Sequence, residues 1–118
     1  LAEMSRFAVN QGADPMTFLG LSGVGDLITT CASPLSRNHA FGKLIGVGLS
    51  VEDAKTKIGQ TTEGIKTLKV VWKKAQEENV PMPIVDSLYR IIFENKPLGG
   101  SIEKVLGRDQ LKDVEFSR

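Results

Sequence analysis

The sequence has few of the side chains that most metal and disulfide sites require. Among its 118 residues there is one cysteine, Cys31, and one histidine, His39. A single cysteine excludes an internal disulfide framework, and two such residues are too few for a Cys/His structural zinc site. We therefore expect no metal site of that kind, and the free thiol favours a reducing compartment.

Long apolar runs and an excess of charge of one sign are also absent. No stretch approaches the roughly 20 apolar residues of a membrane span, and residues 1–20 lack the basic start and apolar block of a signal peptide. Fifteen Lys and Arg against 14 Asp and Glu give a formal net charge of +1, which argues against nucleic acid as the main partner. We expect a cytoplasmic protein.

The sequence does contain enough apolar material for one core, because 41% of its residues are hydrophobic and its length fits a single domain. Leu1, Met4 and Ala8 already repeat at helical spacing with no cap before them, which indicates a piece of a longer protein. We expect a helical domain over residues 1–108 and a polar tail that frays over residues 109–118.

Apolar periodicity predicts an all-α fold of about six or seven short helices with glycine-rich joints, since no stretch alternates with period two. The clearest helical period covers residues 61–79, and a last helix is expected over residues 101–106. Asp14 followed by Pro15 predicts one helix start. Ser50 begins a capping-box pattern that predicts another.

A glycine cluster occupies residues 20–25, where three of six positions are glycine. It predicts a tight turn or backbone break, with a new helix starting at Asp26. The glycine order G-x-x-G-x-G is not the dinucleotide fingerprint, and no strand precedes it, so a phosphate cradle is excluded. Leu27, Ile28 and Cys31 share one apolar face, and we expect Cys31 to be a buried small hydrophobe and not a nucleophile.

A second polar cluster, Ser36-Arg37-Asn38, lies at the expected start of the next helix. Free N–H groups at a helix start favour an anion, and a guanidinium can bind phosphate through two parallel hydrogen bonds. The alternative interpretation is a serine cap with a solvated arginine, and Asp26 and Thr30 could likewise be caps. The residue types alone leave both interpretations open.

Several segments together resemble one family: Gly12-Ala-Asp-Pro15, Gly25-Asp-Leu-Ile-Thr-Thr-Cys31, Ser36-Arg-Asn38, Gly59-Gln60, Glu63-Gly64 and Pro81-Met-Pro-Ile84. With them the chain resembles the C-terminal domain of bacterial-type NAD(P)-dependent sn-glycerol-3-phosphate dehydrogenase. The resemblance implies reversible hydride transfer between NAD(P)H and dihydroxyacetone phosphate, giving sn-glycerol 3-phosphate for phospholipid synthesis. It also implies an N-terminal Rossmann domain that holds NAD or NADP, a homodimeric full-length enzyme, and a fragment that is inactive alone.

The resemblance further implies roles for single residues. Asp26 and Thr30 would be catalytic and lie beside the reacting C2 hydroxyl, and Asp26 would also bind substrate with Ser36, Arg37 and Asn38. The family's general base is a lysine upstream of Leu1. Asp26 would orient that lysine and balance its charge, rather than act as the base itself.

Three residues would contact the cofactor by the same resemblance: Arg37, Thr61 and Glu63. Thr61-Thr62 stands where the family more often has Val-Val, which is a departure from its pattern. A noncatalytic helical module, for dimerisation or regulation, is the competing hypothesis. The enzyme hypothesis requires Asp26, Arg37 and Asn38 to converge on one pocket, whereas a scaffold lets them point apart.

Overall fold

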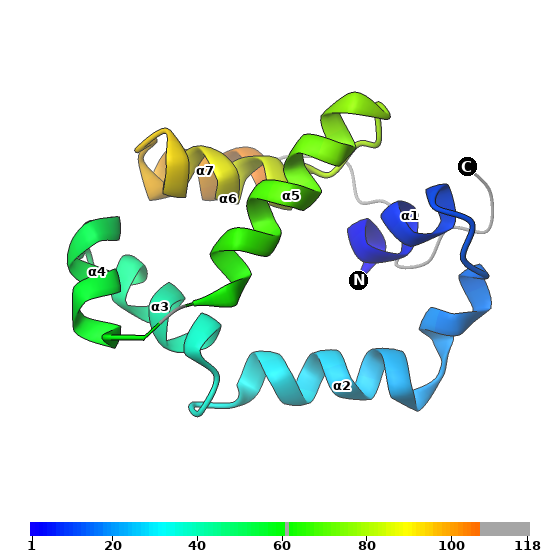
Figure 1. The fold of residues 1–118 in the computed structure, drawn as a ribbon, viewed down its shortest axis with the longest axis horizontal. Helices are drawn as coiled ribbons and strands as arrows, with labels where there is room; N and C mark the ends of the chain where they lie inside the picture. Colours follow the sequence, from blue (N-terminus) through cyan, green and yellow to red (C-terminus); the bar gives the residue numbers. More distant parts are fainter. Residues whose placement is uncertain (61, 107–118) are drawn as a thin grey trace.

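A computed structural model describes the backbone of residues 1–60 and 62–106 (Figure 1). Within these ranges the chain forms seven α-helices and one short 3-10 helix and contains no strand, which confirms the all-α prediction. None of the described helices is long and apolar enough to cross a membrane. Thr61 and the predicted tail, residues 109–118, lie outside the described residues. The elements are α1 Ala2–Asn10, η1 Pro15–Leu19, α2 Leu21–Ala32, α3 Arg37–Gly46, α4 Val51–Ile58, α5 Glu63–Glu77, α6 Pro83–Phe93 and α7 Leu98–Leu106.

Two helix starts form as their capping residues predict. The Asp14 carboxylate accepts a hydrogen bond from the Met16 N–H at 2.9 Å, at the start of η1. Ser50 Oγ accepts one from the Asp53 N–H at 3.1 Å, at the start of α4. Each side chain satisfies a backbone donor that has no partner inside its own helix.

The prediction of a break within residues 20–25 is wrong. The backbone is extended only at Gly20, with φ −84° and ψ 170°, and α2 then runs without interruption from Leu21. Asp26 therefore lies in the middle of α2 and caps nothing. Glycine in a helix is less favourable than alanine by about 1 kcal/mol per residue. Helix propagation is cooperative, however, so a helix can continue through glycines when the neighbouring residues are helical.

The last described helix also begins earlier than predicted, at Leu98 instead of residue 101. The N–H and the hydroxyl of Ser101 both donate to the Pro97 carbonyl, at 3.3 and 3.0 Å. Proline before the first turn suits a helix start, and the first-turn N–H groups need no partner within the helix. Gly99 and Gly100 are thus accommodated in that first turn.

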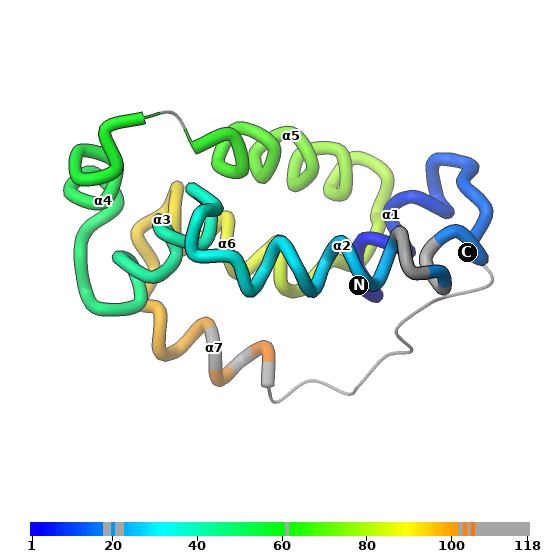
Figure 2. Tube along the Cα trace, turned by 90° about the horizontal axis from the view of Figure 1, so that it is seen from below, coloured from blue at the N-terminus to red at the C-terminus, as the bar shows by residue number. Residues whose placement is uncertain are grey.

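The main core lies where α1 meets the hairpin formed by α5 and α6. Ala75, Val80 and Met82 are buried there, and Phe7 is among the partly buried side chains packed against them. Figure 2 shows α6 between α5 and α7, and α6 packs against both. This core fixes the direction in which α5 leaves the α4–α5 connection.

Two charged side chains of α1 hold the α5–α6 connection in place. The Glu3 carboxylate accepts hydrogen bonds from the N–H groups of Ile84 and Val85, at 2.7 and 3.0 Å. Arg6 donates to the carbonyl of Pro81. Glu3 and Arg6 are both buried, and Glu3 supplies the start of α6 with a cap that its own sequence lacks.

The other helices extend away from this core. In Figure 1, α2 runs along one side of the molecule and α5 along the other, with η1 and α1 joining them at one end and α3 and α4 at the opposite end. Helix α3 packs against α4, while α2 has its main contact with η1. Ile28 is 64% exposed and Cys31 is exposed as well. The prediction that Cys31 is buried is therefore wrong, because no packed layer of the described residues covers it.

Candidate functional site

Two hydrogen bonds hold the first turn of α3 near the start of α5, one to the connection before α5 and one to α5 itself. Arg37 Nη1 donates to Gln60 Oε1 at 3.0 Å. Asn38 Oδ1 accepts from the Gly64 N–H at 3.1 Å. Ser36 begins α3 as its N-cap, with Oγ accepting from the His39 N–H at 3.3 Å. We call Ser36, Arg37, Asn38, Gln60 and Gly64 the α3–α5 corner.

The start of α5 is capped by a residue from another helix. Thr62 occupies the N-cap position, is buried, and makes no side-chain capping bond. Asn38, which is 26 positions from Gly64 in sequence, provides the missing acceptor. Glu63 is exposed in the same turn, where its carboxylate lies 4.0 Å from the Lys66 ammonium.

The charge at the corner favours an anion. Arg37 is exposed and bonds the neutral amide of Gln60, and no carboxylate of the described residues lies within ion-pair distance of it. The positive ends of the α3 and α5 dipoles lie at this corner. A guanidinium and the two Nδ2 protons of Asn38 are the hydrogen-bond donors that a phosphate needs.

Asp26 and Thr30 lie elsewhere, on α2. They are four residues apart, which places them on one face of that helix, and both are exposed. Asp26 makes no hydrogen bond or ion pair with another described residue. The structure thus brings Arg37 and Asn38 together at the corner, and it leaves Asp26 and Thr30 on a helix that does not pack on the corner.

The connection between α2 and α3 is held by His39. Its Nδ1 lies 2.9 Å from the carbonyl oxygen of Cys31, near the end of α2, so that Nδ1–H can donate. This bond ties the helix that carries Asp26 to the helix that carries Arg37. No group of three or more His, Cys, Asp or Glu side chains in the described part of the chain could hold a metal ion.

Two residues of the corner, Gln60 and Gly64, were not predicted from the sequence as partners of Arg37 and Asn38. Their only signal was their place in the segments that resemble the family, Gly59-Gln60 and Glu63-Gly64. A Cβ atom at position 64 would lie 2.7 Å from Asn38 Cγ and 2.9 Å from Nδ2. Those distances are too short for real contacts, so a side chain at position 64 would require the Asn38 side chain to move.

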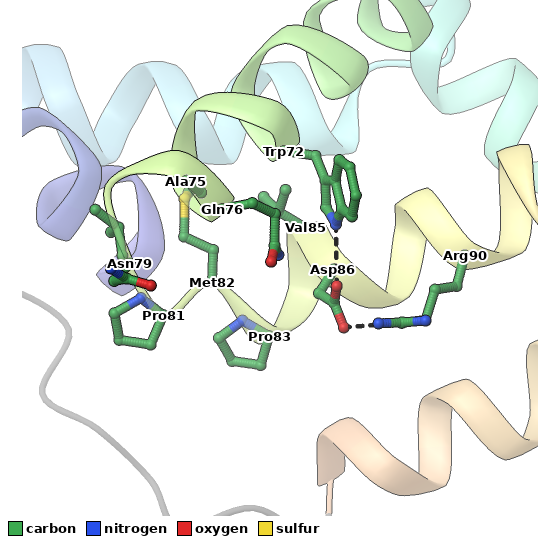
Figure 3. A pocket seen from close by; sticks show the side chains of 11 residues that line it. Trp72, Ala75, Gln76, Asn79, Pro81, Met82, Pro83, Val85, Asp86 and Arg90 are labelled. Atoms are coloured by element: carbon green, nitrogen blue, oxygen red, sulfur yellow. Dashed lines mark hydrogen bonds and ion pairs between the residues drawn. The ribbon is translucent and has the colours of Figure 1, made fainter.

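A separate cavity of about 440 Å³ lies beside the α5–α6 connection (Figure 3). Asp86 accepts from Trp72 Nε1 and from Arg90 Nε there, both at 3.0 Å. The Trp72 ring stacks on Tyr89 with centroids 3.8 Å apart. None of the residues expected to bind substrate or cofactor lines this cavity, so we place the candidate site at the corner and α2.

Comparison with known proteins identifies the family. Residues 1–103 match the family described as NAD-dependent glycerol-3-phosphate dehydrogenase C-terminus. The chain belongs to this family. A protein of Pseudomonas fluorescens (strain SBW25) named glycerol-3-phosphate dehydrogenase (NAD(P)+) is 57% identical over 116 residues, which are 98% of this chain and 34% of that protein. A protein of the same name from Pseudomonas syringae pv. tomato is 55% identical over the same share of each chain.

A solved structure supports the same assignment. The crystal structure of glycerol-3-phosphate dehydrogenase from Coxiella burnetii matches with a TM-score of 0.84 and 34% sequence identity, over 90% of this chain and 33% of that one. The resemblance inferred from the sequence motifs and the all-α C-terminal glycerol-3-phosphate dehydrogenase fold are thus confirmed. The chain spans about a third of the length of the relatives it matches.

Proposed function

We propose that the chain is the substrate-binding domain of an NAD(P)-dependent enzyme that interconverts dihydroxyacetone phosphate and sn-glycerol 3-phosphate, which phospholipid synthesis consumes. The names of its relatives give the reaction class. The observation that supports it most is the α3–α5 corner, where Arg37, without a carboxylate partner among the described residues, meets the Asn38 amide between two helix starts.

The substrate phosphate binds at the corner. Arg37 supplies the cation, the Asn38 Nδ2 group supplies neutral donors, and Ser36 offers a hydroxyl at the start of α3. A phosphate at a helix start gains from the free N–H groups and from the helix dipole. Neutral donors beside the guanidinium add directional hydrogen bonds that a point charge would not provide.

The reacting carbon of the substrate lies toward α2. Asp26 and Thr30 share one face of that helix, and Asp26 has no described partner, so its carboxylate remains available to a group from outside this chain. We infer that Asp26 orients and neutralises the general-base lysine of the complete enzyme. Thr30 hydrogen-bonds the C2 hydroxyl. Removal of the hydroxyl proton by the lysine allows hydride to leave the same carbon.

A nicotinamide cofactor would take up or supply that hydride, and a Rossmann domain outside this chain would hold most of the cofactor. Residues of this chain fit the edge of such a site. Arg37 is free to pair with a cofactor phosphate as well, and Glu63 is exposed at the first position of α5. Thr61 is proposed as a third contact from its place in the sequence.

The exposed apolar face of α2 is suited to pack against the cofactor-binding domain. Ile28 is 64% exposed, and Cys31 lies on the same face. A cofactor domain seated there would bring its lysine to Asp26 and would exclude water from the reacting carbon. It follows that this chain alone is inactive, and we propose that the complete enzyme is a homodimer in the cytoplasm.

A chimera tests the proposal. This chain would replace the matching C-terminal segment of the Pseudomonas fluorescens relative, to which it is 57% identical. We expect the purified chimera to oxidise NADH or NADPH when dihydroxyacetone phosphate is added. We expect this chain alone to oxidise neither cofactor. A chimera that is folded by circular dichroism but leaves both cofactors unoxidised would contradict the proposed function and favour a noncatalytic module.

A further inference from the structure

Residues 33–36 connect α2 to α3, and hydrogen bonds close them into a tight turn (Figure 1). The Ser36 N–H donates to the Ser33 carbonyl at 3.3 Å, and the Leu35 N–H donates to Ser33 Oγ at 3.3 Å. Pro34 lies inside this turn, where its ring restricts φ. The end of α2 and the start of α3 are therefore joined by a short connection with its own hydrogen bonds.

The His39 side chain bridges this connection. His39 is the third residue of α3, and its N–H donates to Ser36 Oγ at 3.3 Å. Its ring reaches back to the last turn of α2, where Nδ1 lies 2.9 Å from the Cys31 carbonyl oxygen. Carbonyls in a last turn have no partner within their own helix, so His39 satisfies one of them. In the described part of the chain, no other hydrogen bond joins a residue of α2 to a residue of α3.

The acceptor decides which nitrogen of the His39 ring carries the proton. A carbonyl oxygen can only accept a hydrogen bond, so this bond requires a proton on Nδ1, and the neutral ring then leaves Nε2 unprotonated. Asparagine places an N–H group at about the distance of Nδ1 from Cα, whereas glutamine places one at about the distance of Nε2. Substitution of His39 by these two amides therefore separates a donor at Nδ1 from a donor at Nε2.

The bridge joins the two helices that carry the proposed substrate-binding residues. Thr30, on α2, directly precedes the residue whose carbonyl His39 binds, and Arg37 lies two positions before His39 on α3. Helix α2 packs mainly on η1, and α3 packs mainly on α4. Packing between α2 and α3 thus contributes little to their relative position, which leaves the turn and the His39 bond to set it.

We propose that His39 is a positioning residue whose Nδ1–H, bonded to the Cys31 carbonyl, fixes α2 relative to α3 so that Asp26 and the α3–α5 corner reach the same substrate. This inference rests on the proposed function, in which the substrate phosphate binds at the corner and the reacting carbon lies toward α2. His39 acts through the two helices and needs no contact with the substrate.

The first test is the kinetics of His39→Ala in the complete chimeric enzyme. Arg37 and Asn38 remain, so KM for dihydroxyacetone phosphate should stay within about threefold of the parent. A displacement of about 1 Å between α2 and the bound phosphate should lower kcat by at least about tenfold. Lys43→Ala, at an exposed residue one turn further along α3, is the matched control and should leave both constants unchanged. A kcat of His39→Ala within about twofold of the parent would overturn the proposal.

Stability and rescue separate positioning from a merely structural role. His39→Ala loses one hydrogen bond at an exposed residue, so Tm should fall by no more than about 3 °C. His39→Asn should restore most of kcat, because its amide N–H can reach the Cys31 carbonyl, and His39→Gln should restore less. Equal rescue by the two amides, or a lower Tm with an unchanged kcat, would overturn the proposal.

Nuclear magnetic resonance of the His39 ring tests the contact without any need for activity. In a chimera isotopically labelled at the histidine ring nitrogens, the signals that disappear in His39→Asn belong to His39. We expect Nδ1 to be protonated and Nε2 unprotonated at a pH where the ring is neutral. The opposite tautomer would refute the contact in an active or an inactive chimera. An inactive chimera with the expected tautomer would refute the proposed function, and the positioning role with it, and would leave the contact confirmed.

Discussion

The α3–α5 corner and α2 both carry residues that we expect to bind the substrate. The residues at the corner have hydrogen-bond partners within the chain, whereas Asp26 on α2 has none among the described residues. At the corner, Arg37 and Asn38 bond residues of another segment and thereby hold two helix starts together. On α2, Asp26 and Thr30 are exposed, and Asp26 has no partner among the described residues. Substitutions at the corner should therefore change both stability and substrate binding, and substitutions of Asp26 should change catalysis alone.

A third region shows what buried polar residues do when no ligand is involved. Glu3 and Arg6 are buried, and their hydrogen bonds end on the backbone of residues 81–85. These hydrogen bonds serve the fold and involve no substrate-binding residue. The candidate site differs from this region, because Arg37 and Asp26 are exposed and neither has an ion-pair partner among the described residues.

The largest effect should follow Asp26→Asn in the chimeric enzyme. Asparagine keeps the size of the side chain but cannot balance the charge of the lysine, so we expect kcat to fall by on the order of 100-fold. Tm should stay within about 2 °C of the parent, because Asp26 is exposed and bonds no described residue. Steady-state kinetics and a thermal melt check both parts, and a kcat within about twofold of the parent would remove Asp26 from the mechanism.

Arg37→Ala comes next. Loss of a charged hydrogen-bond donor to phosphate should raise KM for dihydroxyacetone phosphate by about 30-fold. Arg37→Lys should recover part of this loss, since lysine keeps the charge but lacks the planar pair of donors. Lys43→Ala is the matched control, because Lys43 is an exposed cation on the same helix. An equal rise in KM for Lys43→Ala would show that only the general field of α3 matters.

Glu3→Gln should affect the fold without touching the site. The amide has one acceptor oxygen where the carboxylate uses two, so one N–H at the start of α6 loses its bond. We expect the free energy of unfolding to fall by about 1–2 kcal/mol in urea titrations, with kcat and KM unchanged. Glu52→Gln, at a side chain that is 85% exposed, should change stability little. Equal losses from the two variants would contradict the capping role of Glu3.

The smallest effect concerns Glu78, which joins α5 to the end of α1. The hydrogen bond from Lys74 is the main cause that lowers the pKa of this carboxyl below its ordinary value of 4.5, and amide bonds from Gln11 and Asn10 add to it. The folded state therefore favours the ionised form, and its stabilising contribution is present above the unfolded pKa and is lost as pH falls through the lower folded value. Glu78→Gln should be slightly less stable than the parent at neutral pH, and the two melting temperatures should converge as the pH falls through the lowered pKa of Glu78. A gap that widens in acid would contradict this sign.

Much of the fold follows from local chemistry that can be read in the sequence. Asp14 and Ser50 cap the helices that their spacing predicts, because a cap is an interaction over two or three residues. The break predicted in residues 20–25 was wrong for the opposite reason. Whether glycines interrupt a helix depends on the cooperativity of the whole segment, which composition in a six-residue window does not report.

Burial on α2 could not be predicted from periodicity either. The spacing of Leu27, Ile28 and Cys31 correctly identifies an apolar face, but it does not say which part of the protein covers that face. At the candidate site, Ser36, Arg37 and Asn38 stood out as a cluster of polar groups at a helix start. The pairing of Asn38 with Gly64 spans 26 positions and depends on tertiary packing, so no local pattern could reveal it.

We propose that the α3–α5 corner and α2 act on one ligand. A crystal structure of the chimeric enzyme with sn-glycerol 3-phosphate and oxidised cofactor tests this proposal. We expect the phosphate to be hydrogen-bonded by Arg37 and by Asn38 Nδ2, Gly64 to keep its bond to Asn38 Oδ1, and the C2 hydroxyl to lie beside Thr30 with Asp26 at the lysine. A phosphate bound away from Arg37, or a C2 hydroxyl remote from α2, would contradict it.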